Sequence, residues 1–292
     1  MVLTAEGLDV SAALAWADEH LGRLARVGEL AGGWTSTMLR LVPERGDPAV
    51  LRLMTKEPWR THGPGLTTRE SEVQRMLADG PVPCPRSLAL DADGDVCGLP
   101  AHLMSLLPGA VDLDLVDDSH LEDLASLLAA IHDVRPTIEV REYQPWAWEA
   151  KYVVPAWADD PGTWERAFAV LREPPPAYDS CFLHRDFQPR NVLWQDDAIT
   201  GVVDWVETSI GPAWLDVAHC STNIALLHGT GRAVAFAEAY VRRTGREPDA
   251  FWDVLDVVGF LPPPGRAGFI QDPAQLGRME ERLRVVLGRT DG

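Results

Sequence analysis

The stretch from Cys181 to Trp205 constrains the fold of this chain more than any other part of its sequence. It reads CFLHRDFQPRNVLWQDDAITGVVDW, in which polar residues separate three short apolar runs rich in β-branched and aromatic residues. Such runs predict strands with tight connections. His184, Asp186 and Asn191 fall in the loop after the first strand, and the following hairpin brings Asp204 back towards them. The stretch therefore predicts two carboxylates and an amide at one end of a small sheet.

These side chains suit the transfer of a phosphoryl group. Such a group is already activated, so a protein mainly has to position it and neutralise its charge. Mg²⁺ prefers hard oxygen ligands, which the Asp204 carboxylate and the Asn191 amide can supply. A separate carboxylate, Asp186, can orient an incoming hydroxyl group and accept its proton.

The order and spacing of these residues resemble a known catalytic loop. His184-x-Asp186-x4-Asn191, followed by Asp204, is similar to the catalytic loop and metal-binding aspartate of the kinase superfamily. One loop can match by chance, but here the second aspartate also follows at hairpin spacing on an independently predicted strand. FQPRNVLW, GVVDW and GP-x3-D-x-A-H, which lie within residues 187–219, more closely resemble the aminoglycoside phosphotransferase and choline kinase family.

This resemblance covers nearly the whole chain and is most specific over residues 181–219. It implies an α+β, bilobal protein-kinase-like fold with a small β-sheet N-lobe and a larger, mainly helical C-lobe. Residues 1–105 would form the nucleotide-binding lobe, and residues 106–292 the catalytic and substrate-binding lobe. It also implies ATP or GTP with Mg²⁺ as cofactors, Asp186 as the catalytic residue, and Asn191 and Asp204 as the metal ligands.

The third predicted strand, AVLRLM at residues 49–54, departs from the usual kinase pattern. Kinases place a lysine here to hold the α- and β-phosphates, but Lys56 and Lys151 are the only lysines of this chain. Lys56 falls beyond the strand, so we assign the phosphate contact to Arg52, with Lys56 as the alternative. Arginine presents a planar fork instead of a point charge, so the geometry around the nucleotide can differ.

The resemblance also requires a glutamate to align this cation. The spacing of the apolar residues in TTRESEVQRMLA predicts a helix over residues 67–78. Glu70 is the best match to the kinase glutamate and Glu72 the second. The two side chains point about 200° apart on a helix, so both cannot face the same site.

Three further nucleotide contacts rest on the resemblance alone. The backbone of Ser105 and Leu107, in the predicted hinge at residues 101–109, would bind adenine. Gly33, in the turn GGWTS at residues 32–36, would lie over the ATP phosphates. The sequence contains no GxGxxG fingerprint and no Walker A motif, which argues against Rossmann and P-loop folds.

Composition limits the class of protein. The chain has 292 residues, 46% of them hydrophobic, which is enough for one large domain or two lobes. No apolar run could span a bilayer, and MVLTAEGLDV lacks the pattern of a signal peptide. We therefore expect no membrane partner and a cytoplasmic location.

The cysteines are scattered along the chain, at Cys84, Cys97, Cys181 and Cys220. Such scattering is typical of small core residues in a reducing compartment.

The net charge of −18 has two interpretations. It argues against a nucleic-acid partner, and an acidic cleft would attract a cationic substrate such as an aminoglycoside. A generally acidic surface would give the same net charge, and composition alone favours neither.

Periodicity predicts the remaining elements. We expect an opening helix over residues 9–27, three strands over 28–54, and a helix that begins with a capping box at Ser119 and Glu122. Further helices are expected at 145–155, 163–172, 214–227, 232–243, 249–260 and 273–287. Asp216 resembles the family residue that braces the catalytic loop through its backbone N–H groups. His132 and His184 are expected to be structural.

The resemblance implies transfer of the γ-phosphate of ATP or GTP to a hydroxyl group of an aminoglycoside-type antibiotic, and hence antibiotic resistance. Alternatives are a metabolic kinase for choline, homoserine, a sugar or a macrolide, and a nucleotide-binding pseudokinase. The missing lysine favours the pseudokinase. The presence of Asp186, Asn191 and Asp204 argues against it, because a protein that only binds nucleotide does not need all three.

Overall fold

The computed structural model describes the chain except for residues 1, 3, 5–6, 31, 33–34 and 290–292. The chain forms two compact units, one of residues 1–109 with 200–207 and the other of residues 110–199 with 208–292. The segment 200–207 thus belongs to the first unit although the residues on both sides of it belong to the second. None of the described helices is both long and apolar enough to cross a membrane.

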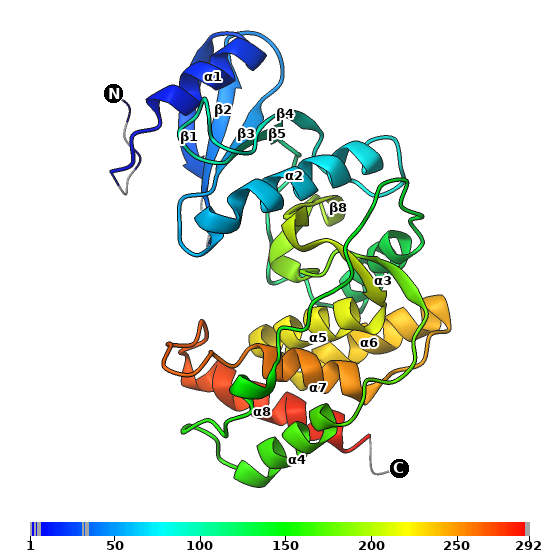
Figure 1. Cartoon of the computed structure of the whole chain (residues 1–292). Helices are drawn as coiled ribbons and strands as arrows, with labels where there is room; N and C mark the ends of the chain where they lie inside the picture. Colours follow the sequence, from blue (N-terminus) through cyan, green and yellow to red (C-terminus); the bar gives the residue numbers. More distant parts are fainter. Residues whose placement is uncertain (1, 3, 5–6, 31, 33–34, 290–292) are drawn as a thin grey trace. The chain divides into compact units, whose positions relative to one another are not determined.

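The first unit is built on a five-stranded antiparallel sheet with the strand order β1-β2-β3-β5-β4 (Figure 1). The strands are β1 (Leu24–Leu30), β2 (Thr37–Pro43), β3 (Ala49–Leu53), β4 (Ser87–Asp91) and β5 (Ala101–Ser105). All residues of the central strand β3 are buried. Helix α1 (Ser11–Leu21) packs its buried face, which includes Trp16, into one apolar core with the sheet.

The expected helix over residues 9–27 is wrong at its C-terminal end. The chain leaves the helix at Gly22, whose φ of +80° favours glycine, and β1 starts two residues later at Leu24. Val27 pairs with Leu41 of β2. The apolar residues that predicted one helix therefore belong partly to α1 and partly to β1.

Helix α2 (Trp59–Leu77) begins earlier than the predicted residue 67. Its first half contains Gly63 and Pro64, which normally oppose a helix. A Cβ atom at Gly63 would lie 2.7 Å from the Pro100 ring, so only glycine allows this close packing. Tertiary contact thus overrides local propensity.

The second unit is mainly helical. Its helices are α3 (Asp118–His132), α4 (Pro161–Arg172), α5 (Trp214–His228), α6 (Thr230–Thr244), α7 (Ala250–Gly259) and α8 (Pro273–Leu287). Every residue of α5 from Trp214 to Leu226 is buried, and this helix packs against α6, α7 and α8 (Figure 1). The four predicted helices after residue 213 are thereby confirmed as α5 to α8.

Two short strand pairs complete the structure. β6 (Ser180–Leu183) pairs with β9 (Ser209–Pro212), and β7 (Val192–Gln195) pairs with β8 (Ala198–Val202). Asp196 and Asp197 connect β7 to β8 with φ values of +51° and +60°, as in a tight hairpin turn.

Two predicted features of the second unit are wrong. Where a helix was expected over residues 145–155, only a single turn forms, at Glu149–Lys151. The N-cap of α3 is Asp117, whose carboxylate accepts from the N–H of His120, so Ser119 does not open the helix. Ser119 instead donates its hydroxyl hydrogen to Asp117.

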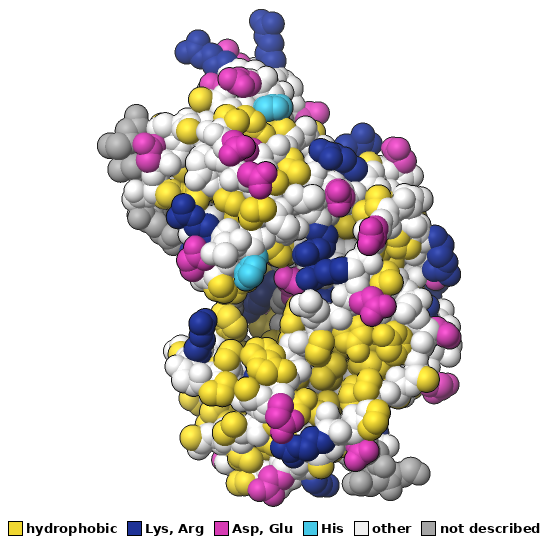
Figure 2. All heavy atoms as spheres, viewed as in Figure 1, with side chains coloured by type: hydrophobic (Ala, Val, Ile, Leu, Met, Phe, Trp, Pro, Cys, Tyr) yellow, Lys and Arg dark blue, Asp and Glu magenta, His cyan; other side chains and the backbone are white. Residues whose placement is uncertain are grey.

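The charged side chains of both signs are mixed on one face of the protein. On the face drawn in Figure 2, Asp and Glu side chains alternate with Lys and Arg side chains instead of gathering in one patch. The segment before α3 has four exposed aspartates, Asp112, Asp114, Asp117 and Asp118. Of these, Asp118 pairs with Arg232 at 2.6 Å.

Candidate functional site

The loop that follows β6 is fixed by a buried carboxylate. Asp216, in the first turn of α5, accepts the backbone N–H groups of His184 and Arg185, both at 2.8 Å. Burial disfavours the charged form of Asp216, but the hydrogen bond from His132 and the nearby His184 outweigh it and lower the pKa of the carboxyl group. These contacts confirm the predicted bracing of the loop by Asp216, and they place His132 and His184 in structural positions.

Arg185 gives the loop its turn. Its φ of +73° is unusual for a residue with a side chain, and such a conformation costs about 1–2 kcal/mol. The guanidinium lies over the ring of Trp146 at 3.8 Å from its centroid. The bond to Asp216 and this stacking hold the strained turn, which presents the next residue, Asp186.

Three side chains donate to the Asp186 carboxylate. Oδ1 accepts from Nε2 of His219 at 2.9 Å and from Nε2 of Gln188 at 2.7 Å, and Oδ2 accepts from Nδ2 of Asn191 at 2.9 Å. The Asp186 side chain remains 24% exposed. Burial acts to raise its pKa, but the bond from His219 is among the contacts that outweigh burial and lower it. Asp186 is therefore ionised at neutral pH.

His219 is a further member of this cluster that the sequence analysis did not select. It lies in α5 between Asp186 and Asp256, with Nδ1 3.0 Å from Oδ1 of Asp256. Burial lowers the pKa of the imidazole, but Asp256 and Asp186 outweigh it and raise the pKa to about 9. In the sequence, a role for His219 is indicated only by its place at the end of the motif GP-x3-D-x-A-H. Its contact with Asp256 could not be predicted, because Asp256 is far along the chain.

Asn191 has the geometry of a metal ligand. Its Nδ2 donates to both the backbone oxygen and Oδ2 of Asp186, at 2.8 and 2.9 Å. Because both partners are acceptors, the amide orientation is determined by the network. Its Oδ1 atom makes no hydrogen bond to any described residue, and this oxygen is the type of ligand that Mg²⁺ takes.

A second cluster lies in the first unit and centres on Arg52. Its Nε is 3.4 Å from Oε2 of Glu70, and its Nη1 donates to Oδ1 of Asp204 at 2.8 Å. Asp204 has a φ of +69°, so the backbone turns sharply at this carboxylate. Lys56 is half-buried beyond the end of β3, and Glu72 is exposed on α2. The structure thus pairs Arg52 with Glu70, the first choice for each position.

Glu70 has a further partner that sequence analysis missed. Oε2 of Glu70 lies 3.0 Å from Nδ1 of His102, whose Nε2 contacts the hydroxyl of Ser87 at 3.0 Å. Glu70 also accepts from the backbone N–H of Trp205. Burial acts to raise the pKa of Glu70, but Arg52 and His102 outweigh it and lower the pKa. An ionised carboxylate thus joins α2, β3 and β5.

The predicted hinge is partly engaged by the protein itself. The N–H of Ser105 donates to the backbone oxygen of Arg86 at 2.9 Å, so this N–H is not available to an adenine base. The Leu107 side chain lies so close to β8 that a Cβ atom at Gly201 would be 2.2 Å from it. Gly33 lies outside the described residues.

The predicted site residues therefore form two clusters, each within one unit. Arg52, Glu70 and Asp204 belong to the first unit, and Asp186 and Asn191 to the second. Within the described part of the chain, no group of three or more His, Cys, Asp or Glu side chains could hold a metal ion. Mg²⁺ does not need one, because it is commonly bound by one or two protein oxygens together with water and phosphate.

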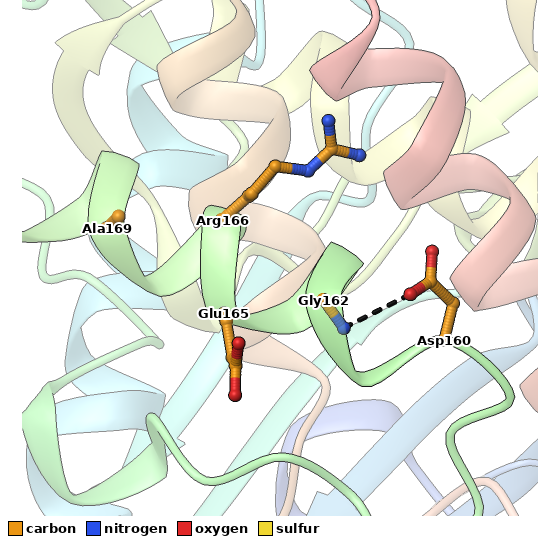
Figure 3. Close-up of a pocket in the computed structure, with 5 residues that line it drawn as sticks. All are labelled: Asp160, Gly162, Glu165, Arg166 and Ala169. Atoms are coloured by element: carbon orange, nitrogen blue, oxygen red, sulfur yellow. Dashed lines mark hydrogen bonds between the residues drawn. The ribbon is translucent and has the colours of Figure 1, made fainter.

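A shallow pocket elsewhere in the second unit contains none of these residues. It is lined by Asp160, Gly162, Glu165, Arg166 and Ala169 at the start of α4 (Figure 3). The Asp160 carboxylate accepts from the N–H of Gly162 at 3.1 Å, which is an ordinary helix cap. In Figure 3 Glu165 and Arg166 point to different sides of the helix, so they do not converge on a ligand.

Comparison with known proteins shows a family match and a shared fold. The model of the phosphotransferase enzyme family (APH) matches residues 26–253. Among curated proteins, none matches the sequence. Among solved structures, the aminoglycoside phosphotransferase APH(4)-Ia, in a ternary complex with ADP and hygromycin B, is 17% identical, with a TM-score of 0.65 over 97% of this chain and 100% of that one.

Two other solved structures have the same fold. The aminoglycoside-3′-phosphotransferase of type VIII is 20% identical, with a TM-score of 0.60 over 85% of this chain and 98% of that one. The macrolide 2′-phosphotransferase MphH from Brachybacterium faecium is 22% identical, with a TM-score of 0.60 over 87% and 91%. These likenesses confirm the predicted α+β, protein-kinase-like fold.

Proposed function

The chain belongs to the phosphotransferase enzyme family, and on this premise we propose that it transfers the γ-phosphate of ATP or GTP to a hydroxyl group of an aminoglycoside-type antibiotic. One observation carries the proposal. Asp186 is an ionised carboxylate, oriented by three donors, in the loop whose sequence matches the family motif. Such a group can orient an alcohol and accept its proton as the phosphoryl group is transferred.

The other predicted site residues have supporting roles in this proposal. Arg52, aligned by Glu70, holds the phosphates, while Asn191 and Asp204 hold Mg²⁺. The metal ion, when bound, neutralises charge on the phosphate oxygens. The backbone of Ser105 and Leu107 would bind adenine.

We assign nucleotide binding to residues 1–105 and acceptor binding and catalysis to residues 106–292. The net charge of −18 supports a cationic acceptor and argues against nucleic acid as a partner. All four cysteines are free thiols, which supports a cytoplasmic location. Under this proposal the protein would confer antibiotic resistance.

The acceptor class rests on the charge and on the relatives, one of which is solved with hygromycin B. A macrolide acceptor is the second candidate, because MphH has the same fold. A screen of aminoglycosides, macrolides and small amino alcohols with ATP or GTP and Mg²⁺, read as the mass gain of one phosphoryl group, distinguishes them. Phosphorylation of amino alcohols alone would instead indicate a metabolic kinase.

The catalytic role of Asp186 has its own test. Asp186→Ala removes the proton acceptor but no proposed nucleotide contact, so we expect turnover to fall at least about 10²-fold with little change in the Kd of ATP measured by calorimetry. Near-normal turnover would contradict the assignment. Nucleotide binding without phosphorylation of any acceptor by the wild-type protein would favour the pseudokinase.

A further inference from the structure

We propose that His219, held by Asp256, is a positioning residue that fixes the Asp186 carboxylate so that Oδ2 faces the acceptor hydroxyl and Oδ1 does not. The inference rests on the proposed function, and it adds to it which oxygen atom reacts and what determines its position. It comes from the hydrogen bonds around the Asp186 carboxylate. If the carboxylate turned, each of its oxygen atoms would lose a hydrogen-bond partner.

The number of donors on each oxygen distinguishes them. Each oxygen of a carboxylate can accept about two hydrogen bonds. Oδ1 accepts two, from His219 and Gln188, whereas Oδ2 accepts one, from Asn191. Among the described residues, only Oδ2 therefore keeps a vacant acceptor position.

The reaction balances at this atom. The oxygen of the acceptor hydroxyl bonds to the γ-phosphorus as the bond from that phosphorus to the bridging oxygen of the nucleotide breaks. The hydroxyl proton passes to Oδ2 of Asp186, and the nucleoside diphosphate leaves with the bonding electrons. Oδ1 keeps its two donors throughout.

The His219 ring is held on every side. Phe260 stacks on it with centroids 5.5 Å apart, and Trp146 meets it edge-on at 5.1 Å. Asp256 of α7 contacts its Nδ1, and the residue is only 4% exposed. Gln188, the other donor to Oδ1, lies in the same loop as Asp186 and is only half-buried. His219 therefore connects the Asp186 carboxylate itself to the helical core, whereas Asp216 holds the backbone of the loop.

A buried oxygen atom without a hydrogen bond supports a dedicated role for Asp256. Its Oδ2 atom is buried and has no hydrogen-bond partner among the described residues, and leaving a buried acceptor unsatisfied is unfavourable. Such a group calls for an explanation. Here the charge on Asp256 keeps the imidazole protonated, and both ring nitrogens then donate, one to each carboxylate.

The charged groups that face His219 are Asp186 from the loop and Asp256 from α7, whereas Phe260 and Trp146 are uncharged. Its pKa of about 9 means that the imidazole is protonated at neutral pH and loses its charge as the pH rises through 9. Above that pH one ring nitrogen no longer donates, and the hold on Asp186 weakens. We expect kcat to decline there.

Paired substitutions test the proposal. His219→Ala removes the donor, and we expect kcat to fall on the order of 10²-fold, as a misplaced catalytic group does, with little change in the Kd of ATP. His219→Gln offers a neutral donor to Asp186, so it should recover part of kcat and abolish the alkaline decline. His228→Gln, at the end of the same helix, is the control and should keep wild-type kcat and its pH profile.

Two outcomes in the kinetics overturn the inference. One is a His219→Ala protein whose melting temperature shows that it is folded and whose kcat lies within about twofold of the wild-type value. Such a small change is well short of the expected loss of kcat. The other is an alkaline decline that persists unchanged in His219→Gln.

A structural measurement separates this inference from the proposed function. Crystal structures of wild type and His219→Ala need no acceptor, and we expect the Asp186 carboxylate to turn or become disordered in the variant. An unchanged Asp186 rotamer would refute the positioning role even if an acceptor had been found. A turned carboxylate in a protein that phosphorylates nothing would support positioning while refuting the proposed function.

Discussion

At the scale of the residue, the molecule repeatedly pairs a buried or half-buried carboxylate with a histidine. Glu70 is paired with His102, Asp216 with His132, and Asp186 with His219. A buried carboxylate is costly unless it is hydrogen-bonded and its charge is compensated. Each pairing therefore allows an ionised side chain to remain where its negative charge is used, either to hold a backbone or to face a ligand.

The pairing at Glu70 leads to a prediction about nucleotide binding. Glu70→Gln removes the negative charge between Arg52 and His102, and breaking a buried ion pair from one side costs about 3–5 kcal/mol. We expect the free energy of unfolding to fall by about that amount and the Kd of ATP to rise about tenfold or more, because a shift of 1.4 kcal/mol in binding is already tenfold.

Glu72→Gln is the matched control for this prediction. It is the same substitution two residues along α2, at an exposed position. We expect unchanged stability in urea unfolding and unchanged ATP affinity by calorimetry. If Glu72→Gln weakens ATP binding and Glu70→Gln does not, the assignment of the aligning glutamate is reversed.

Which residues could be predicted from the sequence follows from how far their partners lie along the chain. Asp186 and Asn191 share one short motif, Arg52 was chosen from its place in the predicted strand, and Glu70 from the resemblance to the kinase helix. His102 and His219 were missed, because their partners come from other elements and no local pattern connects them. Contacts made only in the folded chain, not spacing in the sequence, bring these two histidines to Glu70 and Asp186.

At the scale of the element, the bounds of a helix were predicted correctly where the spacing of its apolar residues was regular throughout. They were wrong where a backbone feature started or ended the helix elsewhere. The helices α5 to α8 follow from their apolar spacing alone. Gly22 ends α1 before the predicted residue, and the close contact of Gly63 with Pro100 lets α2 start early. Neither the positive φ nor the close contact can be recognised from a single sequence.

Gly211 tests how strand β9 supports the loop after β6. It pairs with Cys181 of β6, and a Cβ atom here would lie 2.7 Å from the Tyr143 ring. That ring cannot easily move, because it packs edge-to-face with Trp252. We expect Gly211→Ala to lower the free energy of unfolding by about 1–3 kcal/mol and to reduce kcat, as the strand that leads to Asp186 shifts.

Gly277→Ala is the matched control for this substitution. Gly277 lies inside α8, and a Cβ atom there meets nothing within 4 Å. Alanine favours a helix over glycine by about 1 kcal/mol, so we expect a small gain in stability and unchanged kcat. Urea unfolding and steady-state kinetics measure both. A Gly211→Ala protein as stable as wild type would show that the Tyr143 ring yields.

At the scale of the whole molecule, one continuous motif supplies both units. Residues 181–199 belong to the second unit and carry Asp186 and Asn191, whereas residues 200–207 belong to the first and carry Asp204. Asp204 thereby pairs with Arg52 of the sheet. The most informative stretch of the sequence is therefore the one in which the chain passes between the two units.

The dependence of stability on pH is the corresponding prediction for the folded chain. The pKa of His219 is about 9 in the folded protein, against an ordinary value of 6.5. Its contribution to stability is therefore fully present below pH 6.5 and is lost as the pH rises to 9. Urea unfolding should show a stability difference between wild type and His219→Gln that shrinks over this window.

Burial lowers the pKa of Lys151 to about 8, with the opposite effect on stability, but this contribution is common to both proteins and cancels. A difference that stays constant from pH 6.5 to 9 would mean that His219 is not protonated between its two aspartates.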